Sequence, residues 1–153
     1  MTRFSATMHA DDVVHAPRQE IWDILTDPDR LAPMVPRIHA IEEIGDRWCW
    51  RMRQYNVLGV KFQPSFTERI KTQPPDRIIF THDPGQRREN AGAEGEYRLE
   101  EVDDGTHLWI EITVTVDLPL PKFVRGAVER VMLYEMGRTG DEFATNLRRA
   151  VEG

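Results

Sequence analysis

The sequence lacks the features that mark metal, cofactor or disulfide sites. It contains one cysteine, Cys49, which excludes an internal disulfide and is typical of a reducing compartment. Its five histidines are scattered without ligand spacing, and it has neither a glycine-rich phosphate loop nor a Gly-x-Ser-x-Gly nucleophile motif. We therefore expect no metal and no cofactor.

Long apolar runs and an excess of basic charge are also missing. The first residues contain no apolar stretch of signal-peptide length, and no segment approaches a membrane span, so we expect a cytoplasmic protein without an integral membrane segment. The net charge of −6 argues against nucleic-acid binding. An ordinary globular composition without repeats or linkers predicts one domain over residues 1–153.

Hydrophobic periodicity is strong and changes along the chain from a period of two to a helical period. We expect, in order, a strand over 3–14, two short helices over 17–35, strands over 38–44, 47–54, 60–70, 78–82, 97–99 and 107–116, and a helix over 121–150. Pro64 should bend the fourth strand, and residues 83–95 should form a long loop. If the inward residues of neighbouring strands face each other, Trp50 should lie opposite Phe62 and Gln54 opposite Leu58.

This order predicts an α+β fold with a curved, seven-stranded antiparallel sheet. Seven strands form a sheet roughly 30 Å wide, whereas one helix covers about 10 Å, so the sheet should curl around the C-terminal helix. The two short helices after the first strand should close one end. Gly137 and Gly140 interrupt the helical pattern; a kink or a close packing contact is expected, and a hinge that admits a ligand is the alternative.

The segment "RWCWRMRQ" places Trp48, Trp50 and Met52 on one face of a strand. Their concave, apolar face is typical of a small-molecule pocket, the alternative being that these side chains fill the core. The residues predicted to bind a ligand share this inward phase or face it from the long helix. They are Trp48, Trp50, Met52, Gln54, Phe62, Phe66, Phe80, Ile110, Ile112, Met132 and Met136.

The stretch "VVHAPRQEIWDILTDPDRLAPMVPRIHAIEEIGDRWCWRM" resembles the START-like, Bet v 1-like SRPBCC superfamily, and most closely its bacterial polyketide cyclase/dehydrase-like branch. The resemblance covers about residues 3 to 150 and implies a helix-grip fold. It implies little about activity, since members bind lipids, sterols, quinones or polyketides, catalyse cyclisation, or act in assembly. No catalytic residue is carried over from it.

Inward polar residues are the candidates for chemistry. Glu68, His82 and Tyr97 form a candidate catalytic set, because a buried carboxyl with a raised pKa, an imidazole and a phenol could move protons in an aldol-type cyclisation. Each has a simpler interpretation. A bulge after Pro64 would turn Glu68 outward, His82 would lie on the rim or surface, and Tyr97 would cap the core.

Three functions follow. The first is binding of a small hydrophobic or amphipathic ligand, such as a lipid, isoprenoid or polyketide; the second is an aromatase/cyclase-type enzyme; the third is an interaction module with a vestigial cavity. An outward Trp109 offers a contact for a homodimer. An outward basic run that includes Arg51 and Lys61 is favoured as a solvated surface over a docking site for an anionic partner or membrane.

Overall fold

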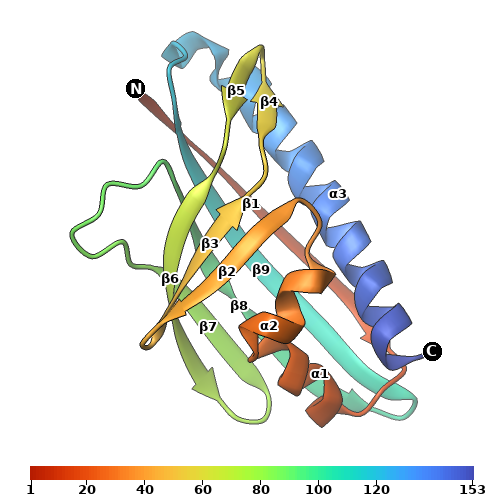
Figure 1. Cartoon of the computed structure of the whole chain (residues 1–153). Coiled ribbons are helices and arrows are strands. Elements are labelled where there is room, and N and C mark those ends of the chain that lie inside the picture. The colour runs from red at the N-terminus through yellow and green to blue at the C-terminus, as the bar shows by residue number, and fades with distance from the viewer.

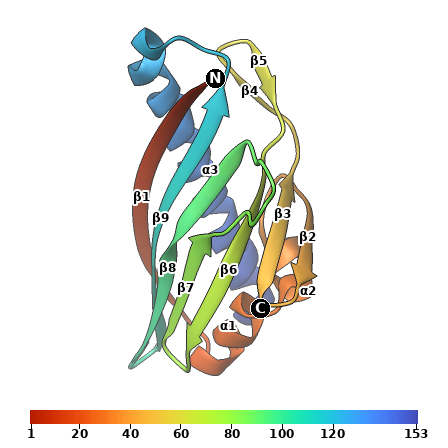
Figure 2. The same cartoon turned by 90° about the vertical axis from the view of Figure 1, so that its left-hand side faces the viewer.

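A computed structural model describes residues 1–153, and its central feature is a strongly curved antiparallel sheet (Figures 1 and 2). Its seven strands are arranged in the order β1-β9-β8-β7-β6-β3-β2. Their bounds are β1 Thr2–Val14, β2 Ile38–Ile44, β3 Arg47–Met52, β6 Ser65–Gln73, β7 Arg77–His82, β8 Ala91–Val102 and β9 Gly105–Leu118. The predicted seven-stranded antiparallel sheet is confirmed.

One long helix, α3 (Arg125–Val151), lies in the concavity of this sheet (Figure 1). Two short helices, α1 (Arg18–Leu25) and α2 (Pro28–Leu31), follow β1 and cover one end. Helix α2 starts where the sequence pattern indicates, because the Asp27 carboxylate accepts the Asp29 N–H at 3.0 Å and Pro28 occupies the first turn. Short 3₁₀ turns, η1 (Ala32–Met34) and η2 (Lys122–Val124), complete the helical elements.

The expected fourth strand is divided in two by Pro64. Its first part, β5 (Val60–Phe62), pairs with β4 (Tyr55–Val57) in a separate hairpin, and only β6 joins the main sheet. Trp50 therefore lies opposite Phe66, and the predicted pairing with Phe62 is wrong. The chain leaves the sheet because Pro64 has no N–H for a ladder, while its carbonyl accepts the Met52 N–H at 3.0 Å.

The expected long loop is shorter than predicted, since β8 begins at Ala91 and leaves only residues 83–90 outside the strands. Two glycines of the expected loop, Gly92 and Gly95, lie within β8, where neighbouring groups leave no room for a side chain. A Cβ on Gly95 would lie 1.9 Å from the Glu111 carbonyl oxygen, and one on Gly92 would lie 2.7 Å from the His82 ring. Glycine marks close approach here rather than a turn.

Helix α3 continues through Gly137 and Gly140 without a break. A Cβ on Gly137 would meet no atom within 4 Å, and one on Gly140 would meet only the Met8 Cε, at 3.6 Å. The expectation of a close packing contact at Gly137 is therefore wrong, because the space beside this residue is open.

The buried side chains form two clusters. One lies under α1 and α2 and includes Ile21, Leu25, Trp48 and Ile78, while the other surrounds the start of α3 and the β4–β5 hairpin. A single helix and two short ones do not fill the remaining width of the curved sheet, and the space left between the sheet and α3 is the candidate site.

Candidate ligand-binding cavity

A cavity of about 400 Å³ lies between the concave face of the sheet and α3. Of the 32 residues that line it, 24 are hydrophobic. Strands β3, β6, β8 and β9 supply one wall through their inward phase, α3 supplies the opposite wall, and the β4–β5 hairpin closes one side. This volume lies within the range of small-molecule pockets, roughly 300–1,000 Å³.

Most of the residues predicted from the sequence to bind a ligand line this cavity, and three do not. Those on its wall are Trp50, Met52, Phe62, Phe66, Ile110, Ile112, Met132 and Met136. Trp48 points inward but packs in the solid core beneath α1 and α2. Phe80 is buried against Tyr97 at a centroid distance of 5.7 Å, outside the lining. Gln54 is exposed, because the chain turns out of the sheet after Met52.

The cavity also contains residues that the sequence reasoning missed. Val114 and Val116 continue the inward phase of Ile110 and Ile112 along β9, so the same alternation could have identified them. Ala91 and Ala93 lie in the segment that was expected to be a loop. Their small side chains leave space that larger residues would fill.

A buried polar group borders the apolar wall. The Trp50 indole N–H is buried without a hydrogen-bond partner in good geometry, while its ring stacks on Phe66 at 6.0 Å and 9°. Trp50 and Tyr97 both line the cavity. Glu68 is only 4% exposed and belongs to the inward phase of β6, but it does not reach the lining. The interpretation in which a bulge turns Glu68 to solvent is therefore wrong.

Burial controls the ionisation of these groups. It raises the pKa of Glu68 from 4.5 to about 8, although the nearby Trp50 indole offsets part of this effect. Burial also raises the pKa of the Tyr97 phenol, and the negative charge of Glu68 raises it further. At pH 7 both side chains are therefore neutral, and the cavity wall contains no buried charge at this point.

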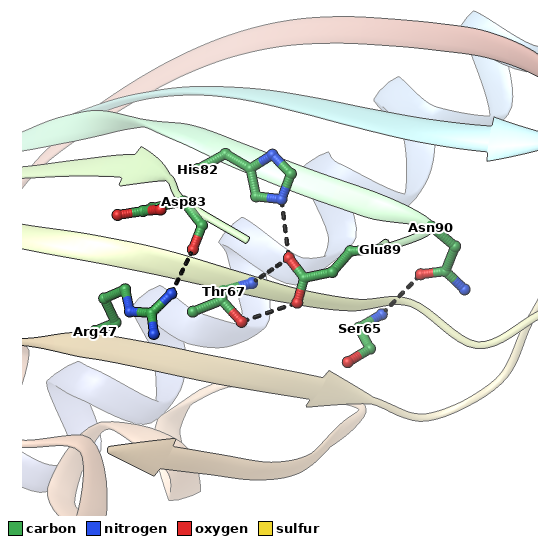
Figure 3. Close-up of polar contacts among 7 residues, drawn as sticks. All are labelled: Arg47, Ser65, Thr67, His82, Asp83, Glu89 and Asn90. Atoms are coloured by element: carbon green, nitrogen blue, oxygen red, sulfur yellow. Dashed lines mark hydrogen bonds and ion pairs between the residues drawn. The ribbon is translucent and has the colours of Figure 1, made fainter. Parts of the chain in front are cut away.

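His82 lies on the opposite, convex side of the sheet, so the expectation that it shares the cavity with Glu68 is wrong. Its ring covers Gly92, whose neighbours Ala91 and Ala93 face the cavity. The His82 Nε2 donates to Glu89 at 3.0 Å (Figure 3).

The Glu89 carboxylate holds the 83–90 loop against this convex face. It is 5% exposed and accepts hydrogen bonds from the Thr67 backbone N–H at 2.9 Å and from the Thr67 hydroxyl at 2.8 Å (Figure 3). Asn90 adds a further anchor by accepting the Ser65 N–H at 3.0 Å. These contacts account for the burial of Thr67 and of Cys49, its neighbour on β3.

The cavity lining carries acidic residues and no basic ones. Asp11, Asp12 and Asp141 line the cavity and are exposed, so they form a rim between β1 and α3, and Glu135 lies farther along the helix. Asp12 pairs with Arg148, and Asp11 accepts a hydrogen bond from His107 at 2.8 Å. Glu135 and Asp141 form no ion pair. The electrostatic character of the site is therefore negative.

A curved sheet that grips a C-terminal helix around an apolar cavity defines the START-like, SRPBCC class. The chain belongs to the family described as polyketide cyclase / dehydrase and lipid transport, which matches residues 1–152. No curated protein sequence matches the chain. None of its helices has the length and apolar character needed to cross a membrane.

Solved structures share this fold at low sequence identity. A START superfamily protein from Mycobacterium smegmatis is 18% identical, with a TM-score of 0.66 over 95% of this chain and 97% of the other. A protein from Thermus thermophilus is also 18% identical, with a TM-score of 0.68 over 94% of both chains. The di-domain ARO/CYC StfQ from the steffimycin biosynthetic pathway is 11% identical, with a TM-score of 0.68 over 97% of this chain. The present chain spans about half of StfQ, 51% of its length.

Proposed function

We propose that the protein binds an uncharged hydrophobic or amphipathic small molecule in the cavity between the sheet and α3. The observation that carries this proposal is the 400 Å³ space itself, with 24 hydrophobic residues among the 32 that line it. Transfer of apolar surface from water into such a space is favourable by about 25 cal/mol per Å². The family's association with lipid transport and polyketide chemistry supports the same class of ligand.

The charges of the site narrow the ligand class. A carboxylate or phosphate group would lose its hydration in a cavity that offers no lysine, arginine or histidine and would face Glu135 and Asp141. The Tyr97 phenol, which lines the cavity and whose pKa burial raises, instead provides one donor for an oxygen of the ligand. The favoured ligand is therefore a neutral isoprenoid, lipid or polyketide with a hydroxyl or carbonyl group.

Retinol and retinoic acid provide a matched test, because they have the same polyene skeleton and differ in charge. We expect retinol to bind and retinoic acid to bind at least about tenfold more weakly at pH 7, as judged by quenching of the tryptophan fluorescence. Native mass spectrometry of the freshly purified protein should also show a retained small molecule. Equal affinity for the two probes would contradict the charge argument, and binding of neither would contradict the proposal itself.

The alternative of an aromatase/cyclase-type enzyme has less support from the geometry. Of its three candidate residues only Tyr97 lines the cavity, since Glu68 lies outside the lining and His82 is on the convex side. A phenol with a raised pKa can donate a hydrogen bond to a carbonyl but is a poor base at neutral pH. The binding function therefore accounts for more of the site.

A further inference from the structure

One end of the molecule combines the β4–β5 hairpin with residues 118–126, which lead into α3. Figures 1 and 2 show both segments at the end opposite α1 and α2. They are joined by a shared core, in which Val57 and Phe62 of the hairpin pack with Leu118 and Val128. We call this region, residues 55–63 with 118–126, the hairpin end.

Two large apolar side chains project from the hairpin end into solvent. Phe123 in η2 is 87% exposed, and Leu58 at the tip of the hairpin is 46% exposed. Neither contributes to the buried core, although Val57 and Val128 beside them do. Phe123 is the most exposed large apolar side chain in the structure, and exposed apolar surface of this kind is typical of interaction sites.

The backbone at Leu58 strengthens this interpretation. Leu58 and Gly59 both have positive φ, 50° and 85°, so the tip is the type of two-residue turn that favours asparagine followed by glycine. A leucine in the left-handed region costs roughly 1 kcal/mol or more relative to such residues. The leucine therefore reduces stability on two counts, its conformation and its exposure, which is expected where a side chain serves binding.

The charge of the hairpin end differs from that of the rest of the chain. Residues 55–63 and 118–126 contain Lys61, Lys122 and Arg125 and no acidic residue, in a protein with a net charge of −6. None of these three basic residues forms an ion pair. Two of the three lysines in the sequence are thus at this end.

We propose that the hairpin end docks on an anionic lipid bilayer. Leu58 and Phe123 insert at the boundary between headgroups and acyl chains, while Lys61, Lys122 and Arg125 contact the anionic headgroups. A protein interface usually has a flat, contiguous apolar patch. The hairpin end instead has two separate apolar side chains surrounded by basic residues, and this arrangement suits a deformable lipid surface better than it suits a protein partner. This inference does not depend on the identity of the cavity ligand.

Docking at this end has a consequence for the cavity. Tyr55, Val57 and Phe62 of the same hairpin form part of the cavity wall. A hydrophobic ligand that leaves past the hairpin of the docked protein would pass into the bilayer and avoid exposure to water.

Flotation with vesicles of phosphatidylcholine, with and without phosphatidylglycerol, tests the proposal. We expect the full chain to bind only the vesicles that contain phosphatidylglycerol, with an affinity that falls as salt increases. Lys61→Glu and Lys122→Glu should each reduce partitioning roughly fivefold or more. Leu58→Asn should reduce partitioning while raising the melting temperature, so lost binding cannot be attributed to misfolding.

Matched controls lie elsewhere on the molecule. Lys71→Glu reverses the third lysine, on the outward phase of β6, and Val102→Asn removes a 39% exposed apolar side chain from the β8–β9 turn at the opposite end. Both should bind vesicles as the unmodified chain does. Three results would overturn the proposal. The unmodified chain could fail to bind vesicles, the controls could lose as much binding as the variants, or the protein could form a dimer that Leu58→Asn dissociates. Retinol binding in solution is measured separately. A negative vesicle result therefore contradicts only bilayer docking, and a negative retinol result contradicts only ligand binding in the cavity.

Discussion

At the scale of single residues, Glu68 is the most unusual group in the structure. Its carboxyl is buried without a basic partner, and burial raises its pKa to about 8 from the ordinary 4.5. The folded state therefore retains a proton that the unfolded state loses between these two values. It follows that the contribution of Glu68 to stability falls as pH rises from 4.5 to about 8 and is constant outside this interval.

Glu68→Gln tests this linkage because the amide has a similar shape and does not ionise. We expect the variant to match the original chain near pH 4.5 and to exceed its free energy of unfolding at pH 7 by up to about 3 kcal/mol. Urea unfolding across this pH range measures the difference. Glu43→Gln, an exposed change on β2, serves as the control and should leave the profile unaltered. A difference for Glu68→Gln that did not vary with pH would contradict the assignment.

At the scale of elements, the glycines of α3 have a physical explanation in the cavity. Gly137 lines the cavity, and its missing side chain leaves open space, although glycine within a helix costs about 1 kcal/mol relative to alanine or leucine. The helix thus loses some stability where the cavity gains volume.

Gly137→Leu should therefore raise stability and impair binding together. We expect up to about 1 kcal/mol of added stability and at least a severalfold loss of retinol affinity, measured by thermal unfolding and by fluorescence titration. Gly126→Leu is the matched control, since Gly126 lies in the same helix and is exposed. Retinol affinities that were equal in the two variants would show that Gly137 does not shape the binding space.

The elements also show how far the sequence can predict this structure. Alternation identified β1 and β9, because their inward residues repeat at every second position. It failed at β5 and at the start of β8. At β5 the cause is Pro64, which ends the ladder of hydrogen bonds. At the start of β8, Gly92 and Gly95 make room for groups that are distant in sequence, and a local sequence pattern does not contain this information.

Prediction of the site was limited by the same physics. The alternation of side chains along the strands places Trp48, Trp50 and Phe80 on one face of the sheet. It does not show which part of that face α1 and α2 cover and which part remains open. His82 has the inward phase by sequence, yet at the end of β7 its ring crosses to the convex side to reach Glu89. Cavity membership is thus a property of packing between elements.

At the scale of the whole molecule, the cavity results from a mismatch between a wide, curved sheet and the few helices that cover it. The two core clusters fill the ends, beneath α1 and α2 and around the start of α3, and leave the middle open. Removal of atoms from the filled part should create a new void, whereas removal from the cavity wall only enlarges an existing one.

Two phenylalanines of the sheet allow this difference to be measured. Phe80 is buried against Tyr97 and lies outside the cavity lining, whereas Phe66 forms part of the cavity wall. We expect Phe80→Ala to cost about 3–5 kcal/mol of unfolding free energy. Phe66→Ala should cost clearly less, because its side chain already lacks neighbours on one side. Urea unfolding of both variants in ligand-free protein measures the two costs, and equal values would mean that the interior beside Phe66 is as full as that beside Phe80.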